Sequence, residues 1–198
     1  MKVLFATTNP AKVKKYKEIL EKNGIELLTI NDLEKTIEVE ETGKDALENA
    51  YIKAKAYYDL TGITTIGMDN TLFIEGLPED KQPGTYVRRV NGKRLTDDEM
   101  IEHYTSLVRK NGEKLIAKWR YGMVIYNERK VKSYTWNTDD FFLVENPASI
   151  RKPGYPLDSI SIDPICNKYF VELTSQDRKK KHTQDMSVEF ILNNISED

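Results

Sequence analysis

Residues 1–20 constrain the fold more than any other stretch of the chain. An apolar run, Val3–Ala6, predicts a short buried strand, and Thr7 and Thr8 end it. Asn9 then stands where a helix N-cap is expected, and Pro10 stands at the first helical position, where a missing N–H has no cost. A buried strand that passes through a capped turn into a helix is typical of α/β proteins, with helices packed on a sheet.

The same turn has the features of an anion-binding loop. A helix N-terminus carries a partial positive charge and unpaired backbone N–H groups, and Thr7, Thr8 and Lys12 add two hydroxyls and an ammonium. The loop lacks the glycines of a P-loop or of a dinucleotide-binding fingerprint, so neither motif is present. Many α/β proteins begin with a strand, a cap and a helix and bind nothing there, and that interpretation stays open at this stage.

Bulk composition excludes several classes of protein. The chain has 198 residues and a net charge of -2, which argues against a protein built for nucleic acid or for an anionic membrane surface. No apolar run approaches the length of a membrane span, and the first apolar stretch is too short for a signal peptide. The single cysteine, Cys166, excludes an internal disulfide and is consistent with a reducing compartment. We therefore expect a cytoplasmic protein.

Hydrophobic periodicity and cap signals predict alternating strands and helices. Thr42 with Asp45, and Thr96 with Glu99, have capping-box spacing, and Gly62 follows an expected helix end. Strands are expected at 25–30, 63–67, 72–74, 115–126 and 130–144, the last two forming a hairpin around Asn127, and helices at 45–60, 97–110 and 185–194.

This order predicts a single α/β domain with a mixed sheet. We expect two lobes, one formed by about 1–75 with the C-terminal helix 185–198 and the other by about 76–145. A cleft between lobes is a usual place for a ligand.

Charged residues in the first half of the chain form candidate groups for phosphate chemistry. Glu40 and Glu41 precede an expected helix, on which Asn49 and Lys53 share one face because they are four residues apart. Asp69 follows an expected buried strand, a common place for metal or acid–base chemistry in α/β folds. Carboxylates with substrate phosphates suit Mg²⁺, and lysines neutralise the remaining charge. Each residue also has an ordinary interpretation as surface charge or as a turn cap.

Taken together, these segments resemble the inosine triphosphate pyrophosphatase family. The resemblance is collinear over almost the whole chain and is most specific in its N-terminal half. It rests on 6–12 (ATTNPAK), 40–43 (EETG), 48–54 (ENAYIKA), Asp69 before Leu72, 83–89 (PGTYVRR), 163–165 (DPI) and 172–174 (ELT).

The resemblance implies an elongated twisted mixed sheet in two lobes with a central cleft, usually in a homodimer. It implies Mg²⁺-dependent hydrolysis of a nucleoside triphosphate to the monophosphate and pyrophosphate, a nucleotide-pool sanitising reaction. Asp69 would be the catalytic proton acceptor and, with Glu40, a metal ligand. The substrate-binding residues it implies are Thr7, Thr8, Asn9, Lys12, Lys53, Asn70, Arg89, Asp163 and His182.

The departures from the family pattern fall mostly where the base is read. Residues 68–72 are Met-Asp-Asn-Thr-Leu where the family usually has Asp-Asp-Ser-Gly-Leu, so one carboxylate is missing at Met68. Residues 160–164 (ISIDP) lack the family's aromatic platform, and the Ser-His-Arg motif becomes 181–183 (KHT) or 182–184 (HTQ). The phosphate lysine expected near 178–181 is not assigned to one residue. Base preference is therefore left open.

Two other functions compete with this one. A catalytically weakened nucleotide-binding or sensor protein on the same scaffold would explain Met68 and the altered C-terminal motif. A nucleic-acid-binding module would use the basic run 178–181, but the near-neutral charge and the lack of interleaved aromatic residues disfavour it. We expect a nucleoside triphosphate as partner, with no nucleic acid and no membrane.

Overall fold

The computed structural model describes residues 1–178 and 185–195, and it divides the chain into two compact units. Unit 1 comprises 1–70, 120–136 and the C-terminal residues from 185, and unit 2 comprises 71–119 and the residues from 137 to 184. Strands β3 (Thr65–Ile74) and β6 (Lys114–Tyr126) contribute residues to both units. The described strands form one eight-stranded mixed sheet and one two-stranded sheet, as the α/β prediction requires.

Parallel strands form the centre of unit 1. Strand β1 (Lys2–Phe5) lies between β2 (Glu26–Thr29) and β3, and it is parallel to both, with Val3 opposite Leu27 and Leu4 opposite Thr65. Strand β6 follows β3 in the sheet, and β7 (Val131–Asn137) pairs with β6. Strand β1 ends opposite Ile66 while β3 continues to Ile74, so Asp69 lies just beyond the carboxyl end of β1, where ligands bind in open α/β sheets.

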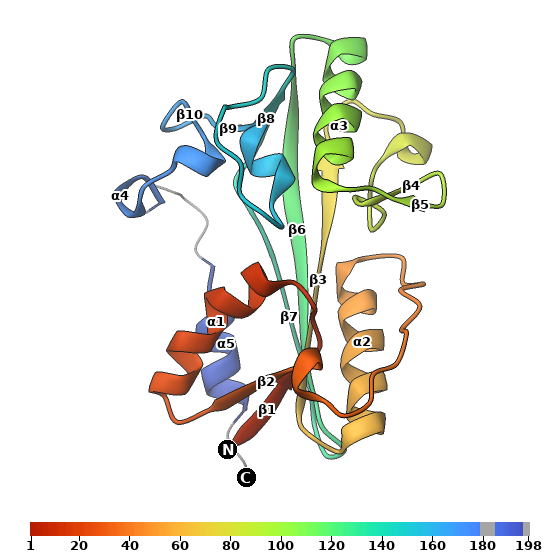
Figure 1. Cartoon of the computed structure of the whole chain (residues 1–198), viewed down its shortest axis with the longest axis vertical. Coiled ribbons are helices and arrows are strands. Elements are labelled where there is room, and N and C mark those ends of the chain that lie inside the picture. Colours follow the sequence, from red (N-terminus) through yellow and green to blue (C-terminus); the bar gives the residue numbers. More distant parts are fainter. Residues whose placement is uncertain (179–184, 196–198) are drawn as a thin grey trace. The chain divides into compact units, whose positions relative to one another are not determined.

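Helices cover both faces of the unit 1 sheet (Figure 1). Helices α1 (Pro10–Lys22) and α5 (Ser187–Asn194) pack on one face, and α2 (Ala46–Thr61) packs on the other. The first core joins alternate strand residues with both helices: Val3, Phe5, Tyr16, Leu20, Ile66, Met68, Met123, Ile125 and Ile191. On the α2 face, Ala50 and Ala54 pack against Val124, and Tyr57 packs with Leu4.

Two glycines allow α2 to lie directly on the sheet. A Cβ at Gly67 of β3 would stand 2.0 Å from the carbonyl oxygen of Ala50, and one at Gly122 of β6 would stand 2.5 Å from the Cα of Leu47. Real Cβ atoms do not approach other atoms this closely, so both positions require glycine. This contact places the N-terminal half of α2 beside the part of β3 that contains Asp69.

Unit 2 is built from antiparallel strands and a long helix. Strand β6 pairs with β8 (Phe141–Val144), β8 with β9 (Ser161–Asp163), and β9 with β10 (Lys168–Tyr169). Helix α3 (Asp97–Asn111) contributes Met100, Tyr104 and Val108 to a core that includes Leu143. The remaining described elements of unit 2 are the hairpin strands β4 (Arg89–Val90) and β5 (Lys93–Arg94), helix α4 (Ser175–Arg178), and 3-10 turns at Glu79–Lys81, Pro156–Ser159 and Phe170–Glu172. One further 3-10 turn, Ile30–Asp32, follows β2 in unit 1.

Most predicted elements are confirmed. Asn9 caps α1 with Pro10 at its first position, Gly62 ends α2 in the left-handed conformation at φ 67°, and Thr96 and Glu99 form the capping box of α3. The turn at Asn127 joins β6 to β7 through paired backbone hydrogen bonds with Lys130.

Three details differ from the prediction. The box of Thr42 with Asp45 is wrong, because Asp45 is itself the N-cap of α2 and its carboxylate accepts the N–H of Glu48 at 2.9 Å. The two short strands expected at 63–67 and 72–74 form one continuous strand, β3. The strand expected at 130–144 is divided into β7 and β8 by residues 138–140.

Among residues 1–178 and 185–195, none of the helices combines the length and the hydropathy that a membrane span needs.

Candidate active site

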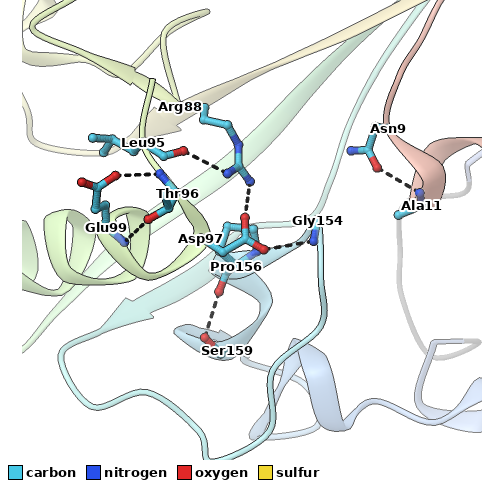
Figure 2. Close-up of polar contacts among 10 residues, drawn as sticks. All are labelled: Asn9, Ala11, Arg88, Leu95, Thr96, Asp97, Glu99, Gly154, Pro156 and Ser159. Atoms are coloured by element: carbon cyan, nitrogen blue, oxygen red, sulfur yellow. Dashed lines mark hydrogen bonds and ion pairs between the residues drawn. The ribbon is translucent and has the colours of Figure 1, made fainter. Parts of the chain in front are cut away.

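The turn between β1 and α1 has the predicted capped geometry. The side-chain oxygen of Asn9 accepts the N–H of Ala11 at 2.9 Å (Figure 2), and the hydroxyl of Thr7 accepts the N–H of Asn9 at 3.1 Å. Thr7 and Asn9 are half-buried and Thr8 is exposed. These bonds hold the loop in one conformation at the positive end of the α1 dipole, where an anion is stabilised.

Three charged side chains meet at the α2 face of β3. The ammonium of Lys53 lies 3.0 Å from a carboxylate oxygen of Glu41 and 3.4 Å from Oδ1 of Asp69. Lys53 is 13% exposed and Asp69 is 15% exposed, whereas Glu41 is 34% exposed. The segment before α2, the helix and the strand each contribute one charge to this cluster. Lys53 and Asp69, two of the predicted site residues, therefore lie together.

Asn49 connects the same three segments inside the protein: it lies on α2, and its side chain contacts both the segment before the helix and strand β3. Its side-chain NH₂ donates to Oδ2 of Asp69 at 3.0 Å, and its side-chain oxygen accepts the N–H of Gly43 at 2.8 Å. Asn49 is only 1% exposed, so both bonds are inside the protein. Its spacing from Lys53 on α2 indicated a shared face, but the contact with Gly43 has no local sequence signal.

Lys12 extends the cluster from the α1 side. Its ammonium donates to the backbone carbonyl of Met68 at 3.5 Å, one residue before Asp69. Burial, together with the positive charge of Lys53, lowers the pKa of Lys12 to about 8, against the opposing effect of Asp69 and Glu41. A half-buried ammonium with a lowered pKa gains stabilisation when an anion arrives beside it.

The oxygen donors of Asp69 and Glu41 fit a magnesium site. Both carboxylates contact one ammonium, Lys53, so both reach the same small volume. The described residues contain no group of three or more histidine, cysteine, aspartate or glutamate side chains placed to hold a metal ion. Mg²⁺ is usually held by one or two carboxylates with phosphate oxygens and water, rather than by a full protein cage. The donor set therefore suits a metal that arrives with a phosphate ligand.

Met68, which stands where the family usually has a second carboxylate, lies on the face of β3 opposite to Asp69. Met68 is 3% exposed and packs in the first core of unit 1, where the Tyr16 hydroxyl lies 3.6 Å from its sulfur. Neighbouring residues of a strand point to opposite faces, so the side chain of residue 68 points toward α1 while that of Asp69 points toward α2. The methionine therefore does not occupy the space beside Asp69.

The two adjacent glutamates have different surroundings. Glu41 makes the ion pair with Lys53, while the side chain of Glu40 is exposed. No described contact joins Glu40 to the cluster, so its predicted metal role remains a prediction and Glu41 is the better-placed carboxylate. The sequence contained both residues but no signal to choose between them. Asn70 is half-buried at the end of the unit 1 part of β3.

A groove of about 650 Å³ lies on another side of α1, within unit 1. Thr7 and Thr8 line it together with Lys14, Lys17 and Asp32, whereas Lys12, Lys53 and Asp69 do not. Its lining mixes acids and lysines, so its charge favours no class of ligand. The charged cluster at β3, which this groove does not include, is the candidate active site.

Two of the predicted substrate-binding residues, Arg89 and Asp163, belong to unit 2. Arg89 is exposed on β4, whereas its neighbour Arg88 donates to the carbonyl of Leu95 at 3.1 Å and pairs with Asp97 at 2.7 Å (Figure 2). Asp97 also accepts the N–H of Gly154 at 3.1 Å. Arg88 thus connects the start of α3 to its neighbouring loops, whereas Arg89 is exposed.

Asp163 has a structural role in unit 2. It is buried at the end of β9, and its Oδ1 accepts the N–H groups of Ile165 and Cys166, both at 3.0 Å. These bonds fix the turn into β10, and a substrate contact of Asp163 stays a prediction. His182 and the lysines at 179–181 lie outside the described residues.

Comparison with known proteins identifies the family. Residues 3–185 match the model of the Ham1 family. The chain is 32% identical over 195 residues to a dITP/XTP pyrophosphatase of Aquifex aeolicus (strain VF5), covering 91% of this chain and 89% of that protein. It is 30% identical over 178 residues to a dITP/XTP pyrophosphatase of Bacillus subtilis (strain 168), covering 89% and 88%.

A solved structure has the same fold. A HAM1 protein from Coxiella burnetii superposes with a TM-score of 0.78 at 22% identity, over 98% of both chains. The fold is that of a mixed α/β protein with a charged cluster on the α2 face of β3. The chain belongs to the Ham1 family, and the predicted resemblance to the pyrophosphatases is confirmed.

Proposed function

We propose that this protein hydrolyses a nucleoside triphosphate to the monophosphate and pyrophosphate, with Mg²⁺ as cofactor. The observation that carries the proposal is the convergence of Asp69, Glu41 and Lys53, with Lys12 coupled to them electrostatically. Relatives that are named dITP/XTP pyrophosphatases support the reaction class. Deaminated purine triphosphates are therefore the first substrates to test, and clearing them would sanitise the nucleotide pool.

In this proposal, different residues of the site bind the phosphates and the metal ion. The capped turn at Thr7–Asn9, Lys12 and Lys53 bind the phosphates and neutralise their charge. Asp69 and Glu41 would hold Mg²⁺, which lowers the charge on the phosphate oxygens when it is bound. Oδ2 of Asp69 is engaged by Asn49, so Oδ1 is the oxygen that faces the ligand side, next to Lys53.

The proposed step is attack of water on the α-phosphorus. Oδ1 of Asp69 takes a proton from the water as its oxygen bonds to phosphorus. The bond between the α-phosphorus and the bridging oxygen breaks, and the electron pair leaves with pyrophosphate. Lys12 and Lys53 stabilise the charge that develops on the phosphate oxygens.

The competing function, a nucleotide sensor without turnover, now has less support. It was motivated in part by the loss of a carboxylate at position 68, but the side chain of Met68 is in the apolar core and not beside Asp69. The substitution therefore removes nothing from the α2 face, where the proposed reaction takes place.

A panel assay tests the proposal. The protein is incubated with Mg²⁺ and with dITP, XTP, ITP and the four standard deoxynucleoside triphosphates, and both pyrophosphate and monophosphate are measured. We expect release of the two products in equal amounts, and we expect Asp69→Asn to abolish it while the protein stays folded. Binding without turnover of any triphosphate would support the sensor, and retained turnover in Asp69→Asn would remove this residue from the reaction.

Two further properties are proposed on the family resemblance. We expect a homodimer, which sedimentation equilibrium tests directly. We also expect the protein to act in the cytoplasm, where the triphosphate pool is found.

A further inference from the structure

The amide of Asn49 is a buried connection between two segments that contain charged residues of the site. Its oxygen accepts the backbone N–H of Gly43 at 2.8 Å, and its NH₂ group donates to Oδ2 of Asp69 at 3.0 Å. Asn49 is 1% exposed. Gly43 lies two residues after Glu41, and Asn49 lies one helical turn before Lys53 on α2. One side chain thus links the segment of Glu41, the helix of Lys53 and the strand of Asp69.

The two partners allow only one orientation of this amide. A backbone N–H can only donate, so the oxygen of the Asn49 side chain must face Gly43. The NH₂ group is then the part that faces Asp69, and it requires an acceptor there. Reversing the amide would place donor against donor at Gly43 and acceptor against acceptor at Asp69. The buried amide therefore fixes which carboxylate oxygen, Oδ2, points into the protein.

Close packing makes this arrangement rigid. A Cβ at Gly43 would stand 2.6 Å from the side-chain oxygen of Asn49, so only glycine lets the segment approach the helix this closely. On the other side, Gly67 brings the backbone of Ala50 into direct contact with β3. The segment that contains Glu41 and Gly43, helix α2 and strand β3 are therefore in close contact around Asn49, next to the charged cluster.

We propose that Asn49 is a positioning residue: its amide orients the carboxylate of Asp69 and holds the segment of Glu41 at a fixed separation from it. This inference rests on the proposed function and assigns a role to a residue that does not touch the substrate. Oδ1 of Asp69 then faces the Lys53 side in a single orientation, and the two carboxylates stay close enough for one divalent ion. Misplacement of catalytic groups by about 1 Å is sufficient to lower rates on the order of 100-fold.

The test compares Asn49→Ala with Tyr57→Phe. Tyr57 is on the same helix, and its hydroxyl donates to the carbonyl of Ile37 at 3.0 Å, in the segment that leads to Glu41. The control therefore also loses one hydrogen bond from α2 to that segment, but it touches no charged group of the cluster. We measure kcat and KM for the best triphosphate, urea denaturation, and Mn²⁺ binding to the nucleotide-free protein by electron paramagnetic resonance.

For Asn49→Ala we expect kcat to fall by about 30-fold or more. KM should change by less than about 3-fold, because Lys12 and the capped turn still bind the phosphates, and Mn²⁺ affinity should fall by about 10-fold. Tyr57→Phe should keep all three values within about 2-fold of the unmodified protein at a comparable loss of stability. A kcat and an Mn²⁺ affinity that stay within about 2-fold in Asn49→Ala would overturn the proposal.

A second variant covers the case in which Asn49→Ala does not fold. Asn49→Asp has the same shape and still accepts from Gly43, but it replaces the donor with an acceptor opposite Oδ2 of Asp69. We expect kcat to fall at least 30-fold in a folded protein, and unchanged turnover would overturn the proposal. If the unmodified protein turns over no triphosphate, the proposed function fails. Mn²⁺ binding then still decides whether Asn49 organises the two carboxylates.

Discussion

At the scale of single residues, the charge state of Lys12 depends strongly on its surroundings. Burial and the nearby ammonium of Lys53 lower its pKa to about 8 in the free protein. The ammonium is therefore charged below about pH 8 and loses its proton above it. A bound phosphate stabilises the charged form, so binding must take up a proton when the pH is above this pKa.

This predicts pH-dependent affinity for a triphosphate. Binding of an α,β-methylene nucleoside triphosphate without metal should be strongest below about pH 8 and should weaken by up to tenfold per pH unit above it. Calorimetry in matched buffers measures both the affinity and the proton uptake. Lys12→Met should lower the affinity and remove the slope, whereas Lys14→Met, at an exposed position of α1, should keep it. An affinity that does not change with pH would show that Lys12 does not contact the phosphates.

Met68 and Asp69 are neighbours on one strand but have different roles: Met68 packs in the apolar core, and Asp69 belongs to the charged cluster. Met68→Asp places a carboxyl group in the core beside Tyr16, so we expect the free energy of unfolding to fall by about 2 kcal/mol or more. Met68→Leu, which conserves volume and polarity, should cost less than about 1.5 kcal/mol. Urea denaturation measures both. A stable Met68→Asp protein with tighter Mg²⁺ binding would show that this side chain does reach the site.

At the scale of elements, the contact of α2 with β3 determines the geometry of the site. The helix carries Asn49 and Lys53, the strand carries Asp69, and Gly67 is the point where their backbones meet. The side chains of the cluster can contact one another only while this helix stays directly on the sheet. A substitution at Gly67 therefore tests whether the contact of α2 with β3 is needed for activity, without changing any charged group.

We expect Gly67→Ala to lower turnover strongly. Its Cβ would meet the carbonyl oxygen of Ala50 at 2.0 Å, so α2 must move away and withdraw Asn49 and Lys53 from Asp69. Unfolding free energy should fall by about 2 kcal/mol, as is usual for overpacking, and kcat should fall by at least tenfold.

Gly24→Ala is the matched control for this substitution. Gly24 has φ +76°, but a Cβ added there would meet no atom within 4 Å, so alanine costs only about 1 kcal/mol of backbone strain. Turnover should not change in this variant. Normal turnover in Gly67→Ala would mean that the site tolerates movement of α2.

The elements that the sequence predicted well depend on short-range contacts. The Asn9 cap, the Gly62 helix end and the Thr96–Glu99 box each involve residues within four positions of one another, so local residue types decide them. The continuity of β3 across 68–71 could not be predicted, because Asp69, Asn70 and Thr71 are polar residues and the contacts of Asp69 are with Asn49 and Lys53, which are distant in sequence.

Among the candidate site residues, Asp69 and Lys53 were predictable because each lies at a defined place on a regular element. The choice of Glu41 over Glu40 was not predictable, since both residues lie in an irregular segment whose path depends on Asn49. The orientation of Met68 was not predictable either, because strand alternation gives it only once β3 is known to be continuous through residues 68 and 69.

At the scale of the whole molecule, the residues predicted to contact the substrate are divided between the two units. Each unit has its own hydrophobic core, and the described residues of the charged cluster all belong to unit 1. Arg89 and Asp163, which were predicted to contact the substrate, belong to unit 2. Binding of the phosphates and recognition of the base are therefore expected to respond differently to substitution in the two units.

This division predicts the pattern of hydrogen exchange when a ligand binds. Ligand binding stabilises the segments that contact it against local opening, and the effect is greatest where those contacts lie. With Mg²⁺ and an α,β-methylene triphosphate, we expect the largest protection at 7–12, 40–53 and 66–70, all in unit 1. Asp69→Asn should reduce this protection, while Arg89→Ala should retain it. Protection that is greatest at 89–94 or 161–166 would place the principal phosphate contacts in unit 2 and would contradict the assignment of Lys12, Lys53 and Asp69.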